Sequence, residues 1–166
     1  MKNEVMKVFN TYTEALSKGD FGEVFKTIAD DIVWHMGGES SLSGVIVGKQ
    51  ALGKRLSEFT ERSKGTFRII INWAASNDCF VAASVISLAE RGEEKLKNPG
   101  IDLFRIENGK IQEVWTFGEL QEEEDRFWEW EKSQLQKIFL KSVIGFFTNS
   151  YNSYIPIFSN FIIEFF

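Results

Sequence analysis

The chain has 166 residues, of which 43% are hydrophobic and 26% are charged, and its net charge at pH 7 is −5. This length suits one domain with a real core, and the composition excludes an intrinsically disordered protein. The negative charge argues against a nucleic-acid partner, which needs a basic surface. Cys79 is the single cysteine, so no internal disulfide can form, and the charged first ten residues are unlike a signal peptide. We therefore expect a cytoplasmic protein.

The first part of the chain predicts three amphipathic helices, because apolar residues recur there at helical spacing. They cover residues 3–18, the segment from Asp20 to Asp30-Asp31, and residues 49–62. Gly19 is suited to end the first helix, and Asp20 with Glu23 resembles a capping box that starts the second. A short strand at residues 32–36 and a loop at residues 37–44 are expected between the second and third helices.

From Thr66 onward the sequence changes to the β-rich runs of a sheet. The runs cover residues 66–75, 80–90, 96–106 and 111–118. Asn108-Gly109, between the last two, is a strong signal for a hairpin. Helices come first and an antiparallel meander closes the domain, so the fold class is α+β, with helices covering one face of the sheet.

The last 35 residues differ in composition from the rest. Residues 132–166 contain no Ala, Asp or Arg and are rich in Phe and Ile, although Thr148-Asn149-Ser150 interrupts any membrane-spanning stretch. They could dock to a membrane surface or a partner. Alternatively they add nothing to function and derive from translation past the natural end of the domain, which we favour. We therefore expect a domain at residues 1–131 and an aromatic-rich extension at residues 132–166.

Two acidic features stand out before that extension. The run from Glu119 to Glu131 holds seven acids against Arg126 alone, and we interpret it as a solvated helix face. Asp102 lies within an apolar strand, where alternation places it on the same face as Phe104 and Ile106. Either this face meets water, or Asp102 is buried and must be paired or protonated. A neutral acid in an apolar pocket can donate a hydrogen bond, which is useful in catalysis.

The order of these elements and four short motifs resemble the SnoaL-like proteins of the nuclear-transport-factor-2-like (NTF2-like) superfamily. The motifs are Ala15-Leu16-Ser17-Lys18-Gly19-Asp20, Ala29-Asp30-Asp31, Gly48-Lys49-Gln50-Ala51-Leu52 and Asn108-Gly109-Lys110-Ile111. The resemblance covers about residues 3–130. It implies a cone-shaped, cystatin-like architecture in which a curved antiparallel sheet wraps over three helices around a deep apolar cavity. Members commonly form dimers through the outer sheet face, so the resemblance also implies a homodimer.

Within the superfamily, the sequence looks most like ketosteroid isomerase at two places. Tyr12 matches its oxyanion-hole tyrosine, and the segment around Asp102 matches the one that carries its protonated aspartate. The resemblance therefore implies that Tyr12 and Asp102 form a pair of hydrogen-bond donors facing the cavity. Met36 stands where the isomerase has its general base. A thioether cannot take a proton from carbon, so the isomerase's own route is not expected here.

His35 is a candidate replacement for the missing base. It titrates near neutral pH, but alternation puts it on the opposite strand face from Trp34 and Met36 unless a bulge turns it inward. A structural or surface role is the alternative.

Glu119 is a second candidate base. Counting back from the hairpin pairs Asp102 with Trp115, so Asp102, Trp115, Phe117 and Glu119 are expected to share one sheet face. SnoaL-like cyclases resemble this pattern in using a carboxylate near the end of that strand as acid or base. Alternatively, Glu119 merely begins the acidic run.

Six residues are expected to contact a ligand: Trp34, His35, Met36, Phe104, Trp115 and Phe117. Their apolar side chains either line an open cavity or fill it completely. We expect no cofactor, because the sequence has no dinucleotide or phosphate-binding fingerprint. We expect no metal either, because one histidine and one cysteine far apart cannot build a conventional zinc site.

The leading hypothesis is a domain that binds a small hydrophobic carbonyl-bearing molecule, with isomerase- or cyclase-type proton transfer through Tyr12, Asp102 and Glu119. The alternative is a non-catalytic NTF2-like module that binds a small ligand or dimerises. Met36 in place of the base favours the alternative, whereas Tyr12 with Asp102 favours chemistry.

Overall fold

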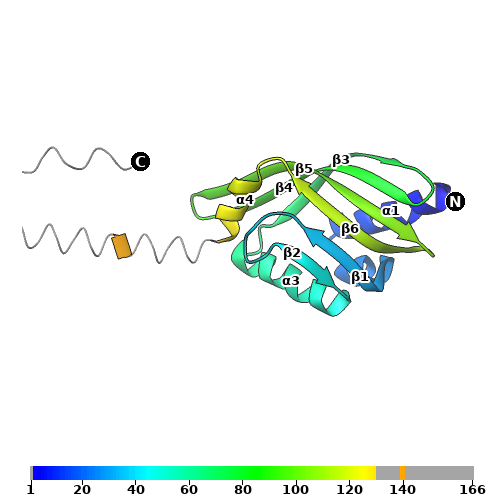
Figure 1. Cartoon of the computed structure of the whole chain (residues 1–166), viewed down its shortest axis with the longest axis horizontal. Helices are drawn as coiled ribbons and strands as arrows, with labels where there is room; N and C mark the ends of the chain where they lie inside the picture. Colours follow the sequence, from blue (N-terminus) through cyan, green and yellow to red (C-terminus); the bar gives the residue numbers. More distant parts are fainter. Residues whose placement is uncertain (1, 130–138, 141–166) are drawn as a thin grey trace, which may run out of the picture. The chain divides into compact units, whose positions relative to one another are not determined.

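The computed structural model describes residues 2–129 and 139–140. All but two of these residues belong to one unit, in which four helices and six strands form an α+β fold (Figure 1). The expected fold class is therefore confirmed. Nearly all of the predicted extension at residues 132–166 lies outside the described residues. Within the described part, no helix is both long enough and apolar enough to cross a membrane.

The elements follow the predicted order closely. The helices are α1 (Lys2–Ser17), α2 (Phe21–Thr27), α3 (Lys49–Arg62) and α4 (Gln121–Trp128). The strands are β1 (Ile28–Met36), β2 (Gly44–Val47), β3 (Arg68–Ser76), β4 (Phe80–Arg91), β5 (Glu94–Glu107) and β6 (Lys110–Gly118). The cap of α2 is the one predicted, since the Asp20 side chain accepts a hydrogen bond from the Glu23 N–H at 3.0 Å.

The first half of the chain contains two departures from prediction. Helix α2 ends at Thr27, so Asp30 and Asp31 do not terminate it but lie within β1. Ile28 and Ile32 are buried in the core, while both aspartates are exposed. The strand thus starts four residues earlier than expected because its apolar residues reach the core from an extended backbone. The second departure is β2, which pairs with the end of β1 where only a loop was expected.

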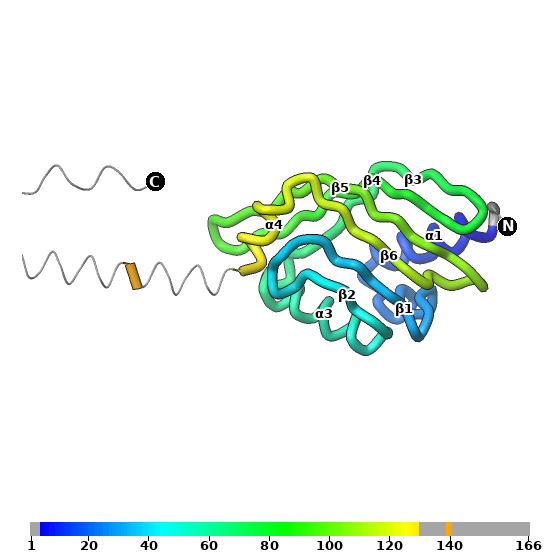
Figure 2. The backbone as a smooth tube through the Cα atoms, in the orientation of Figure 1, coloured from blue at the N-terminus to red at the C-terminus, as the bar shows by residue number. Residues whose placement is uncertain are grey.

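The strand order is β2-β1-β6-β5-β4-β3, as the tube in Figure 2 shows. Neighbours run antiparallel except that β1 and β6 are parallel, so the sheet is mixed rather than wholly antiparallel. Two-residue periodicity carries no information on strand direction, and β1 reaches the sheet through a long connection that permits either one. Helix α1 packs on β3 to β6, and α3 packs on β1 and β2.

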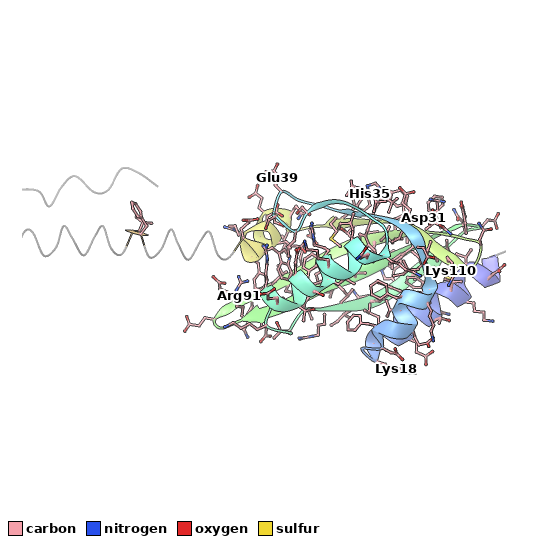
Figure 3. All side chains as sticks on the ribbon, turned by 90° about the horizontal axis from the view of Figure 1, so that it is seen from below. Lys18, Asp31, His35, Glu39, Arg91 and Lys110 are labelled. Carbon is pink, nitrogen blue, oxygen red and sulfur yellow. The ribbon has the colours of Figure 1, made fainter. Side chains whose placement is uncertain are left out.

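Helix α4 closes one end of this unit. Its Phe127 and Trp128 join a second apolar cluster with Leu42, Phe59 and Leu96. Arg91, labelled in Figure 3, stands at the end of β4. Its guanidinium group lies over the Phe127 ring at 4.4 Å and donates a hydrogen bond of 2.7 Å to the Phe127 carbonyl oxygen. These contacts hold α4 against the sheet.

A β-bulge in β6 changes the register of the central hairpin. Ile106 pairs with Ile111, but Arg105 pairs with Glu113, so Gln112 is an extra residue on β6. Beyond the bulge, Asp102 pairs with Thr116 and not with Trp115. The expectation that Asp102, Trp115, Phe117 and Glu119 share one sheet face is therefore wrong, because one additional residue exchanges the two faces of β6.

Candidate functional site

The helices and the inner face of the sheet enclose a cavity of about 180 Å³. Most of its wall is apolar and comes from α1, α2 and the strands. Members of this apolar wall include Tyr12, Leu16, Val24, Trp34, Ile71 and Phe104. A cavity of about 150 Å³ accepts a benzene ring. This cavity therefore suits a molecule of one or two rings.

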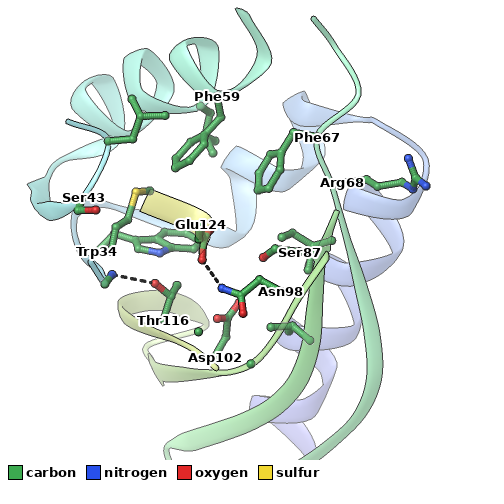
Figure 4. Close-up of a pocket in the computed structure, with 18 of the residues that line it drawn as sticks. Trp34, Ser43, Phe59, Phe67, Arg68, Ser87, Asn98, Asp102, Thr116 and Glu124 are labelled. Atoms are coloured by element: carbon green, nitrogen blue, oxygen red, sulfur yellow. Dashed lines mark hydrogen bonds between the residues drawn. The ribbon is translucent and has the colours of Figure 1, made fainter. Parts of the chain in front are cut away.

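Polar side chains gather at the end of the cavity that α4 closes. Asn98 and Asp102 come from β5, Thr116 from β6, and Glu124 and Asp125 from α4. Figure 4 shows Asn98 between Asp102 and Glu124, with Thr116 beside them. The cavity thus has a largely apolar wall and one end that carries three carboxylates, as expected for a site that orients a mostly hydrophobic molecule.

Tyr12 is a hydrogen-bond donor on the apolar side. Its side chain is 7% exposed, and its ring centroid lies 5.7 Å from that of Phe104. Burial raises the pKa of Tyr12 far above its ordinary value, and the nearby negative charge of Asp102 raises it further. The phenol therefore keeps its proton at all physiological pH values and can donate it in a hydrogen bond.

The side chain of Asp102 is half-buried and has no hydrogen-bond partner among the described residues. Burial raises its pKa from 3.8 to about 7, and the charge of Glu124 contributes to the rise. Below about pH 7 the side chain is therefore mostly a neutral acid. A neutral carboxylic acid has one O–H donor, which in this cavity is free to meet a bound molecule.

Glu124 is held by two buried neighbours. Asn98 Nδ2 donates to one of its oxygens at 2.5 Å, and Trp128 Nε1 donates to the other at 3.3 Å. Sequence analysis missed Glu124, because it interpreted the whole acidic run as a solvated helix face. A signal was nevertheless present, because Glu124 precedes Trp128 by four residues and shares its helix face. Nothing in the sequence singled out Asn98.

Trp34, Met36, Phe104 and Phe117 line the cavity, whereas His35 and Trp115, the other two predicted contacts, do not. Phe117 touches the rim and is 58% exposed. His35 and Trp115 lie on the opposite sheet face, where their rings stack with centroids 5.2 Å apart. The indole N–H of Trp34 is buried without a hydrogen-bond partner in the described part of the chain. It is thus a further unpaired donor in the cavity wall.

Glu119, the predicted acid or base, is exposed and does not line the cavity. Its backbone N–H donates to the Pro99 carbonyl oxygen at 2.8 Å, which fixes the turn into α4. The carboxylates of this acidic run that reach the cavity are those of Glu124 and Asp125, because α4 packs against β5.

Comparison with known proteins gives consistent results. The model of the SnoaL-like domain family matches residues 9–114. A Xanthomonas campestris protein of unknown function with a cystatin-like fold is similar, with 33% identity, a TM-score of 0.71, and coverage of 75% of this chain and 97% of that one. No curated protein matches the chain.

Two more distant structures share the fold. An NTF2-like protein of Burkholderia xenovorans has 16% identity and a TM-score of 0.60, covering 72% of this chain and 92% of that one. A Mesorhizobium loti protein, proposed to be a SnoaL-like polyketide cyclase, has 23% identity and a TM-score of 0.57, covering 68% and 97%. The chain belongs to the SnoaL-like domain family and has the NTF2-like fold.

Proposed function

We propose that the cavity binds a small, mostly apolar molecule through a carbonyl or phenolic oxygen, to which Tyr12 and Asp102 donate hydrogen bonds. The observation that carries this proposal is the half-buried Asp102, whose side chain lines the cavity with Tyr12 and has no hydrogen-bond partner among the described residues. A polar side chain that is largely removed from bulk water and has no protein partner can gain a hydrogen bond from a ligand. A ligand oxygen would satisfy both donors at once, and the apolar wall would take the rest of the molecule.

The same pair of donors suits an enzyme that forms an enolate. When a proton leaves the carbon beside a carbonyl group, negative charge develops on the oxygen, and preorganised donors stabilise that charge more than they stabilise the ground state. Removal of one such donor typically costs about 3 to 4 kcal/mol of transition-state stabilisation. We therefore propose isomerase- or cyclase-type chemistry. The Mesorhizobium loti neighbour, proposed to be a polyketide cyclase, supports this class by analogy of fold.

A fluorescence titration with 1-naphthol tests the proposal, because a phenolic oxygen imitates an enolate oxygen. We expect wild type to bind it, and Tyr12→Phe and Asp102→Leu each to weaken binding about tenfold, since each removes one hydrogen-bond donor from the cavity wall. Glu123→Gln, an exposed change on α4, is the matched control and should bind as wild type does. Binding that is indifferent to both cavity variants would refute the role of the donor pair.

A non-catalytic ligand-binding module is the second candidate. Met36 lines the cavity at the place where the resemblance to ketosteroid isomerase would put a general base, and it cannot accept a proton. A module of this kind would bind 1-naphthol and show no proton exchange with any bound ketone, which the following experiment measures.

A further inference from the structure

We infer that Glu124 exchanges a proton with the molecule bound in the cavity, and that Asn98 and Trp128 position its carboxylate. This inference rests on the proposed function, because it supplies the proton acceptor that an enolate-forming site needs. It also makes α4, a helix outside the predicted site, part of the catalytic machinery.

The other carboxylates that line the cavity in the described part have different tasks. Asp102 is the hydrogen-bond donor described above. The oxygens of Asp125 accept four hydrogen bonds, twice as many as those of Glu124, which ties α4 to the loop after β1. The donors are the backbone N–H groups of Glu39 at 2.9 Å and Ser40 at 3.1 Å and the side chains of Gln121 and Ser43. His35 and Glu119 do not line the cavity. Glu124 is therefore the cavity carboxylate that remains to accept a proton.

The position of Glu124 is strongly determined. Asn98 is 2% exposed, and its Oδ1 accepts the Leu120 N–H at 2.8 Å. The amide orientation is thereby set, so Nδ2 must face Glu124. With Trp128 Nε1 on the other oxygen, each carboxylate oxygen has one donor and keeps a further lone pair for a proton. A base supported in this way by buried neighbours is held ready for reaction without losing its acceptor capacity.

Glu124 and Asp102 face the same small space, where one ligand can meet both (Figure 4). In the proposed step, a C–H bond beside the carbonyl group breaks and the proton bonds to a Glu124 oxygen. The electron pair of that bond forms a C=C bond, and the carbonyl π pair moves to the oxygen, where Tyr12 and Asp102 stabilise it. Reversal returns a proton to the same or a neighbouring carbon, so no other reactant is needed.

Deuterium exchange into 2-tetralone in D₂O, followed by proton NMR, tests this step with a defined probe. We expect wild type to exchange the protons beside the carbonyl group faster than buffer does, and Glu124→Gln to reduce the rate about 100-fold, the typical contribution of a general base. Glu123→Gln should exchange at the wild-type rate. Glu124→Ala should recover part of the lost rate when formate is added, because formate can occupy the vacated space and accept the proton.

Two readouts separate the inference from the proposed function. The affinity of Glu124→Gln for 1-naphthol should stay within a fewfold of wild type, which shows that the variant is folded and that its donor pair works. Exchange by Glu124→Gln at the wild-type rate, or binding of 2-tetralone by wild type without exchange above buffer, would overturn the role of Glu124 and leave ligand binding intact. Loss of the Tyr12 and Asp102 effects on naphthol binding would overturn the proposed function itself.

Discussion

Strands β5 and β6 carry carboxylates on both faces of the sheet, and these carboxylates differ between the two faces in their partners and in the direction of their pKa shifts. On the outer face, Glu113 contacts His35 Nε2 at 2.8 Å and accepts hydrogen bonds from Arg105, and these partners hold its pKa below the usual range. On the inner face, Asp102 has no such partner, and burial raises its pKa. The carboxylate of Glu113 thus has hydrogen-bond partners on the outer face, whereas that of Asp102 has none among the described residues on the inner face.

We propose from this difference that the outer face contributes to stability and the inner face to ligand binding. An acid with two cationic or hydrogen-bonding partners gains from folding, whereas a buried acid without a partner loses from it. A folded protein keeps such a costly arrangement most readily where a ligand later satisfies it. Substitutions of Asp102, Glu113 and Glu107 test this comparison.

The largest effect is expected from Asp102→Asn. The folded protein keeps a proton on Asp102 between the unfolded pKa of 3.8 and the folded value of about 7, while the unfolded chain releases it. Wild-type stability should therefore fall as pH rises through this window, by up to about 4 kcal/mol. Asp102→Asn lacks this loss, so its free energy of unfolding relative to wild type should increase with pH. Urea unfolding at several pH values measures both curves, and parallel curves would contradict the assignment.

The effect of Glu113→Gln on the free energy of unfolding should have the opposite pH dependence and should be smaller. The pKa of Glu113 is lowered from 4.5 in the folded state, so its contribution is present at neutral pH and is lost as pH falls through the folded value. We expect the variant to lose about 1 kcal/mol at neutral pH and to approach wild type in acid. The same urea series measures this loss. A cost that persists undiminished at low pH would show that it comes from packing.

Glu107→Gln should have the smallest effect. The Glu107 carboxylate lies 2.8 Å from Arg105 but its side chain is 47% exposed, so water and salt screen the pair. We expect a loss of at most about 0.5 kcal/mol in unfolding free energy, which should vanish in high salt. A loss as large as that of Glu113→Gln would mean that Arg105 depends on both acids to keep its position.

The hairpin at Asn108-Gly109 and the extent of α3 could be predicted because local patterns determine them. The pairing of β1 with β6, the strand β2 and the bulge at Gln112 depend on distant parts of the chain. The amino-acid type of Gln112 does not mark it as a bulge residue, so the alternation of apolar residues in β6 does not indicate the bulge. Counting from the hairpin therefore assigned Trp115 to the wrong face, whereas alternation within β5 placed Asp102 and Phe104 on the same face.

The candidate site shows the same division between local and tertiary information. Tyr12 could be predicted from the resemblance to ketosteroid isomerase. Asp102 could be predicted from the same resemblance and from its charge within an apolar strand. Glu124 could not, because it belongs to a run of charge, which indicates solvent, and Glu122 and Glu123 before it are indeed exposed. Only the folding of α4 onto β5, which buries Trp128, brings Glu124 and Asp125 to the cavity.

The bulge at Gln112 determines which side chains of β6 face the cavity. If Gln112 paired with Arg105 as in a regular ladder, every later residue of β6 would move by one partner and change face. Trp115 would then pair with Asp102 and turn inward in place of Thr116, and its indole would occupy space now open to a ligand. Deletion of Gln112 would remove only the bulge and would leave Arg105 paired with Glu113 and Asp102 paired with Thr116. A slip of one position in this hairpin would therefore fill the cavity although every lining residue kept its identity.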